Sequence, residues 1–278
     1  MTTENLYATV ADYKAYKRVR GGDPFSDDAP DDAVIADFLR QASRYIDDQI
    51  GTHVFYPEYG TRVYNAGADR YIYLKKDLLE LLTFMNGNGV AIASTEYLFD
   101  DPNVTPYFGV KIRDTSSTVW QPNTYASFEQ SLSIYGIWGY HSKYARAWRA
   151  SGTLGAAVTD TTGLTLTLTT GHSLTAGQII KIDTELFNLE TVSATSATVN
   201  FRADNGSTAA THLINAPVYV WQVEPLAHQA TLETAHYAYE RRYGKSADNT
   251  ATVTQAGIVL SPRDIPVLAQ KFIESYMI

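Results

Sequence analysis

The period at which apolar side chains recur changes along this chain, and that change constrains the fold more than any other feature. Between Val34 and Ile50 apolar residues return every three to four positions, the period that places them on one face of an α-helix. From Phe55 to about Tyr140 short apolar and aromatic alternations are separated by Gly, Pro and Asn, which is typical of β-strands. A chain with both periods is expected to fold as a mixture of helices and sheet.

Capping residues set the bounds of the two helices expected near the start of the chain. Thr9 can cap the amide of Asp12, so a short first helix is expected to begin there and to end near Arg18. Gly51 is placed to end the next helix in a left-handed conformation. The apolar face of that second helix consists of Val34, Ile35, Phe38, Leu39, Ala42, Tyr45, Ile46 and Ile50.

Two further helices are expected near the end of the chain. Pro225 suits the first turn of a helix that runs to about Tyr243, where Gly244 would end it. Residues 246–257 are expected to form a polar loop, and capping signals at 261–266 then predict a last helix over 264–276. The apolar stripe of the last helix consists of Ile265, Leu268, Ala269, Phe272, Ile273 and Tyr276.

The first β-rich segment has recognisable strands and one turn. The asparagine and glycine pairs at 86–89 predict a tight turn. The strands are expected at residues 61–64, 71–74, 96–99, 109–112 and 131–138. They would form a small sheet packed against the helices.

A second β-rich segment lies at residues 151–221, where Thr, Ala, Ser and Val dominate and charges are few. Its expected strands lie in LTLTLTT, QIIKID, ELFNLETV, SATVNF and PVYVW. Such short, regularly spaced strands predict a compact all-β module, a sandwich or a barrel. The fold class is therefore α+β: a small helical core over 1–150 and 222–278 with its own β-rich segment, interrupted by an inserted β domain at 151–221.

Composition excludes several classes of function. The chain has no cysteine, so disulfides and thiolate chemistry are excluded. Its net charge of -8 disfavours nonspecific adhesion to a phosphate backbone. No basic leader or long apolar run occurs in the sequence, so we expect a soluble, unexported protein that does not bind membranes.

Chemistry-bearing residues do not converge into a recognisable motif. The six histidines are dispersed, and His228 and His236 would lie about 12 Å apart on one helix, too far for one metal ion. Asp183 and Glu185 share one face of a strand-like segment and could serve as a glycosidase pair. A hairpin with one polar face explains them better. We expect no catalytic, cofactor or metal site, and no enzyme activity.

A family resemblance emerges from the order of these segments. The run A-S-x-x-I-D at Ala42 to Asp47 leads through the aromatic and proline segment at 55–57 into a strand that carries Tyr64, and the strand LSIYGIWGYH follows. This layout, together with the two C-terminal helices, resembles the head-tail adaptor proteins of tailed bacteriophages. The resemblance covers most of residues 5–150 and 222–278.

The inserted module is similar to a small β domain that recurs in phage virion proteins. The usual pattern of that domain is R-G-x-x-G-T-x-A-x-x-H. This chain approximates it with Arg202, Asn205, Gly206, Ser207, Thr208, Ala209 and His212, and has Ala203 where glycine is common. The resemblance implies the fold of the module, while a binding role of its turn stays open.

The adaptor resemblance implies a dodecameric ring beneath the portal protein, in the neck of the virion, after assembly in the host cytoplasm. The ring would extend the DNA channel without binding DNA specifically, and it would dock the stopper or the tail-terminator protein. The C-terminal tail is the expected portal interface. Its residues are Phe272, Ile273, Tyr276, Met277 and Ile278.

Three alternatives stay open. The chain could form another virion ring, such as a stopper or tail-completion protein. Residues 151–221 could be a glycan-binding adhesion module, or Asp183 and Glu185 could serve a hydrolase. If the module is only an insertion, its replacement by a short linker is expected to leave ring assembly intact.

Overall fold

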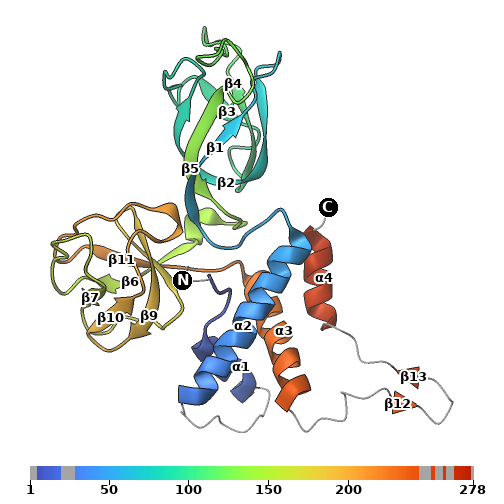
Figure 1. Ribbon diagram of the computed structural model, residues 1–278, viewed down its shortest axis with the longest axis vertical. Coiled ribbons are helices and arrows are strands. Elements are labelled where there is room, and N and C mark those ends of the chain that lie inside the picture. The colour runs from blue at the N-terminus through green and yellow to red at the C-terminus, as the bar shows by residue number, and fades with distance from the viewer. Residues whose placement is uncertain (1–4, 20–28, 244–251, 254–258, 261–265, 277–278) are drawn as a thin grey trace.

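The computed structural model describes residues 5–19, 29–243, 252–253, 259–260 and 266–276. Within these ranges the chain has four helices and two large antiparallel sheets, which confirms the predicted α+β class. Figure 1 shows the helices gathered on one side, with one β unit beyond their upper end and a second β unit beside them.

The helical bundle consists of α1 (Val10–Val19), α2 (Ala29–Ile50), α3 (Pro225–Tyr243) and α4 (Val267–Tyr276). The predicted caps of the first two helices are present. The amide of Asp12 donates to the Thr9 hydroxyl at 3.1 Å, and the amide of Thr9 donates to the Asp12 carboxylate at 2.8 Å. These reciprocal bonds form a capping box. After α2, Gly51 has a φ of 68°, the left-handed conformation that favours glycine.

Small side chains on α3 allow the helices to pack closely. Ala227, Ala230 and Ala235 are fully buried. The first two face Ile46 of α2, while Ala235 joins a cluster around Leu39. Apolar burial on this scale stabilises the folded chain by about 25 cal/mol per Å² of surface removed from water.

The A-S-x-x-I-D run ties the N-terminal segment to α2. The amide of Tyr7 donates to the Ser43 hydroxyl at 3.1 Å, and the Tyr7 hydroxyl donates to Asp47. The same phenol oxygen accepts from the amide of Phe55 at 3.0 Å. Tyr7 is fully buried. One phenol therefore joins the start of the chain, α2 and the segment that leads into the first sheet.

The first sheet has the strand order β1-β5-β2-β4-β3. Its strands are β1 (Glu58–Tyr64), β2 (Tyr71–Met85), β3 (Tyr97–Phe99), β4 (Tyr107–Ile112) and β5 (Leu132–Trp138). All five predicted strands are present, but β2 is much longer than the expected 71–74. Its first residues pair with β4 and its last with β5, across a register shift. The polar run at 75–77 concealed this continuation, because it breaks the apolar alternation.

The second sheet closes into a barrel. Its strand order is β6-β11-β8-β9-β10-β7. The strands are β6 (Trp148–Thr153), β7 (Thr165–Thr167), β8 (Ile179–Ile182), β9 (Glu185–Val192), β10 (Ser196–Val199) and β11 (Pro217–Trp221). Backbone bonds from Gly155 to Thr167 at 2.9 Å and from Thr169 to Thr153 at 3.0 Å connect the two outer strands. The barrel encloses its own apolar core, in which Ile180, Phe187 and Val218 are fully buried.

The chain enters the barrel through β6 and leaves through β11, and these two strands pair with each other. This pairing brings the two ends of the unit together, as an insertion requires. Sequence reasoning missed β6, because WRASGT has no apolar alternation, and β6 begins at Trp148, ahead of residue 151.

The C-terminal part differs from the expectation at Leu268 and within the expected polar loop at 246–257, where Thr252 and Val253 form a short strand. Leu268 was predicted to join the buried stripe of α4, yet its side chain is 43% exposed, whereas Ala269, Phe272 and Ile273 are buried. The short strands β12 (Thr252–Val253) and β13 (Val259–Leu260) pair with each other. The expected helix end at Gly244 and the expected caps at 261–265 lie outside the described residues.

The pKa of Asp47 provides a test of the burial of this carboxyl group beside Tyr7. Burial raises this pKa to about 6, although the hydrogen bond from Tyr7 and the positive charge of Arg44 act to lower it. A raised pKa stabilises the folded state below the ordinary aspartate value of about 4, and that stabilisation is lost as pH rises through about 6. Between pH 4 and 7 the free energy of unfolding should therefore fall by about 2 kcal/mol more for the parent than for Asp47→Asn. Urea unfolding of both proteins across this range measures the difference, and parallel pH profiles would contradict the assignment.

Candidate functional site

The first sheet and the barrel meet at one apolar junction. The residues of this junction come from the first sheet, from the segment before β6 and from the barrel: Tyr59, Leu79, Ile137, Ala147, Ile179, Leu186 and Trp221. The indole of Trp221 also donates to the carbonyl of Phe55 at 2.9 Å. The barrel is thus packed onto the rest of the chain. Its replacement by a linker would uncover this apolar surface, so we now expect that change to impair folding.

The sequence pattern at 202–212 forms a buried charge network inside the barrel. Glu185 is 0% exposed and accepts two hydrogen bonds from the Arg202 guanidinium, each at 2.8 Å. It also accepts from the amides of Ala203 at 3.0 Å and Ala210 at 2.9 Å. Burial alone would raise the pKa of Glu185, but these bonds outweigh burial and hold the pKa below its ordinary value.

His212 completes the network and joins the two acidic residues singled out in the sequence. One ring nitrogen lies 3.0 Å from Glu185, and the other lies 2.7 Å from Asp183. Asp183 sits in the turn between β8 and β9 with a φ of 52°. Both carboxylates therefore hold the shape of the barrel. Because Glu185 is enclosed and fully hydrogen-bonded, this arrangement gives no support to a hydrolase that uses the pair.

The same turn also faces outward, toward the rest of the chain. The side-chain amides of Asn205 and Asn5 exchange hydrogen bonds at 2.8 and 3.2 Å. Gly206 has a φ of 72°, and a Cβ placed on it would lie 2.2 Å from the carbonyl oxygen of Tyr59. Glycine is required here by both conformation and close approach. The turn is η2 (Asp204–Gly206), and it docks the barrel against β1.

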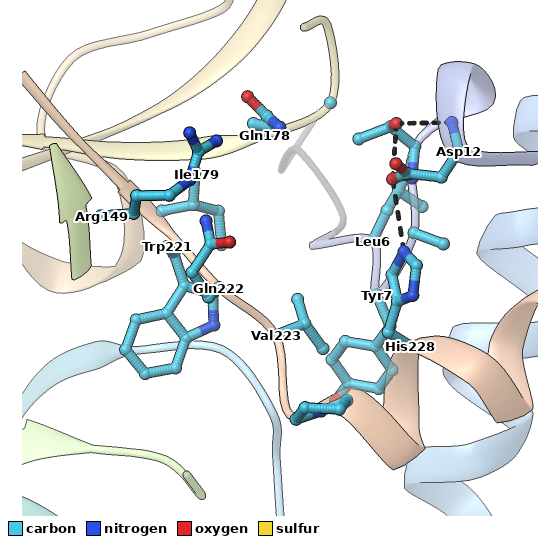
Figure 2. A pocket seen from close by; sticks show the side chains of 14 residues that line it. Leu6, Tyr7, Asp12, Arg149, Gln178, Ile179, Trp221, Gln222, Val223 and His228 are labelled. Atoms are coloured by element: carbon cyan, nitrogen blue, oxygen red, sulfur yellow. Dashed lines mark hydrogen bonds and ion pairs between the residues drawn. The ribbon is translucent and has the colours of Figure 1, made fainter. Parts of the chain in front are cut away.

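A cleft of about 440 Å³ opens between the barrel and the bundle. In Figure 2, Arg149 and Gln178 lie on the barrel side, while Asp12 and His228 lie on the helical side. The His228 ring lies 3.4 Å from the Asp12 carboxylate. Burial acts to raise the pKa of Asp12, but bonds from His228 and Thr9 lower it overall. The acid and the base of the cleft are therefore already partnered, and the pair fastens α3 to the start of α1.

The predicted portal-contact residues lie mainly inside the chain. Phe272 and Ile273 are each 4% exposed and pack in one cluster with Ile46 and Phe55. Tyr276 is partly buried, with its ring centroid 5.0 Å from that of Tyr140. Met277 and Ile278 lie outside the described residues. The apolar side chains that α4 exposes are Val267 and Leu268.

Each histidine has a separate partner, and sequence reasoning had identified none of these contacts. His53 lies 2.6 Å from the Asp77 carboxylate, and His141 accepts from the amide of Lys143 at 3.0 Å. The remaining partners are Ser193 for His172, Asp183 and Glu185 for His212, Asp12 for His228, and Tyr13 for His236. In the described part of the chain, no group of three or more His, Cys, Asp or Glu residues is arranged so that it could hold a metal ion.

Neutralising Glu185 should destabilise the chain strongly. In a Glu185→Gln variant the Arg202 guanidinium, which is 4% exposed, keeps its charge but loses its anionic partner. We expect a loss of about 3 kcal/mol in unfolding free energy. The matched control is Glu190→Gln, because Glu190 lies on the same strand with its side chain exposed. Chemical unfolding of both variants gives the comparison, and equal effects at the two positions would refute the structural role.

No protein-family model, curated protein or solved structure matches this chain. Every helix that the structure describes is too short or too polar to cross a bilayer.

Proposed function

We propose that this chain is a structural protein of a tailed-bacteriophage virion, a head-tail adaptor. It forms a ring, a dodecamer, beneath the portal protein, extends the DNA channel and docks the stopper or tail-terminator protein. The main support is the role of the residues that carry the adaptor resemblance. Ser43 and Asp47 bind Tyr7, and Phe55 connects that contact to the barrel. The resemblance therefore rests on residues that build the framework.

Large exposed side chains support a role in assembly. Tyr125 in the first β unit is 88% exposed, and Leu213 in the barrel is 80% exposed. Exposed aromatic and aliphatic side chains on separate units are suited to contacts with neighbouring proteins. A closed ring would use such surfaces in heterologous interfaces between copies.

The net charge of -8 is consistent with a channel through which DNA moves. Like charge keeps a polyanion from adhering to the wall, and nonspecific binding to phosphates depends on clustered Lys and Arg. DNA would pass through the lumen without specific contacts.

The glycan-binding alternative has less support from the barrel. Its aromatic residues, Trp148, Phe187, Phe201, Tyr219 and Trp221, are all buried or half-buried. The large apolar side chains that it exposes are aliphatic, at Leu164, Leu213 and Ile214. Ligand sites for small molecules usually offer accessible aromatic surface together with polar groups.

Portal binding is the decisive experiment. We would mix the purified protein with its cognate portal protein and image the complex by electron microscopy. A ring seated on the portal is the expected result. A protein that neither binds the portal nor forms a ring on it would contradict the proposed function.

The contact on α4 can be tested without disturbing its packed face. Leu268→Asp combined with removal of Met277 and Ile278 leaves Phe272 and Ile273 in place, and it should abolish portal binding. Leu226→Asp is the matched control, because Leu226 is an exposed leucine on the neighbouring helix α3. If the α4 variant binds as well as the control, the portal contact lies elsewhere.

A further inference from the structure

Two strand edges of the first sheet are left without partners. β1 lies at the end of the sheet and pairs with β5 alone, and the start of β2, Tyr71 to Tyr73, pairs with β4 alone. Among the described residues, no backbone hydrogen bond joins β1 to this part of β2. Unpaired strand edges carry free amides and carbonyls that can pair with another chain.

An open groove of about 600 Å³ is lined by both edges. Its walls consist of Thr61, Arg62, Val63, Tyr64 and Asn65 on one side and Tyr71, Ile72, Tyr73, Lys75 and Lys76 on the other, with Gly67 between them. Val63 is 55% exposed and Tyr73 is 64% exposed. The groove therefore combines free backbone groups with uncovered apolar side chains.

The turn η2 lies against strand β1 near the start of the strand. Tyr59, near the start of the strand, lies against Gly206 of η2. Thr61 and Val63, farther along, point their side chains outward and are exposed. The free edge thus extends along the second half of β1, toward Tyr64.

The charge of the groove is opposite to that of the protein. Arg62, Lys75 and Lys76 line it, and no carboxylate does, in a chain whose net charge is -8. Two of these cations are already engaged. Arg62 lies 3.8 Å from the Glu58 carboxylate and stacks over the Trp138 ring at 4.8 Å. Lys76 donates to the carbonyls of Gly51 and Thr52. The Lys75 side chain is exposed, and its ammonium group makes no hydrogen bond or ion pair with any described residue, so it is available to an acidic ligand.

We infer that this groove binds an extended acidic peptide segment of a partner protein, which adds as a strand to the free edge of β1. Backbone pairing would supply affinity, and the apolar and cationic side chains would select the sequence. A peptide strand fits these features better than a nucleic acid, because the unpaired amides and carbonyls of a strand edge match another peptide backbone. Alternating carboxylate and apolar side chains would match Lys75 on one side and Val63 on the other.

A synthetic peptide provides the test. The probe is a fluorescent peptide with the length of β1, seven residues, in which glutamate and valine alternate. Fluorescence anisotropy with the whole purified protein should show saturable binding. A peptide with lysine in place of glutamate, and one with N-methylated amides on the edge that would pair, should each bind at least about tenfold more weakly. Lys75→Glu should weaken binding of the first peptide by a similar factor, whereas Lys143→Glu, an exposed lysine outside the groove, should not.

Several outcomes would overturn the inference. Equal binding of the glutamate and lysine peptides would exclude charge selection, and unchanged binding after N-methylation would exclude strand addition. Displacement of the probe by single-stranded DNA but not by unlabelled peptide would assign the groove to nucleic acid. If the folded protein did not bind the probe peptide at all, the inference would also be rejected. Peptide binding by the isolated chain does not require a ring, so these results are independent of portal docking.

Discussion

The backbone of Phe55 connects the three parts of this chain. Its amide donates to the phenol oxygen of Tyr7, which α2 holds through Asp47, and its carbonyl accepts from the indole of Trp221. A buried backbone group without a partner would cost roughly 1 to 3 kcal/mol. Both polar groups of Phe55 are satisfied by side chains far away in the sequence, so the bundle, the first sheet and the barrel are held in one arrangement. The ring of Phe55 is fully buried and packs on Phe272 of α4.

The residues in and around the turn η2 of the barrel have two structural roles. Arg202 and His212 point inward to Glu185 and set the shape of the turn. Asn205 and Gly206 point outward and hold the turn against Asn5 and β1. The inward network is costly to desolvate and is stable only when every partner is present. The position of Asn205 and Gly206 against Asn5 and β1 therefore depends on the charged side chains buried behind the turn.

Much of this fold follows from local sequence signals. The capping box at Thr9, the glycine end of α2 and the strands with apolar alternation all have causes within a few residues of each other. Strand β6 and the second half of β2 escaped prediction, because their order comes from pairing with strands that are distant in the sequence. The roles of Tyr7, Glu185 and Gly206 were hidden for the same reason. Each of these roles depends on contacts that only the folded chain creates. The apolar stripe of α4 alone could not show whether that face packs inside the chain or binds a partner protein.

The most direct test of this account is a distance measurement between the two β units. The chain has no cysteine, so spin labels can be placed at Leu82→Cys in β2 and Glu190→Cys in β9, both exposed strand positions. Pulsed electron paramagnetic resonance should give one narrow distance distribution. Trp221→Phe, which removes the donor to Phe55, should broaden it, whereas Trp120→Phe, which removes an indole donor to Asp69 within the first β unit, should not. A broad distribution in the parent protein, or no change with Trp221→Phe, would contradict the claim that Phe55 holds the units together.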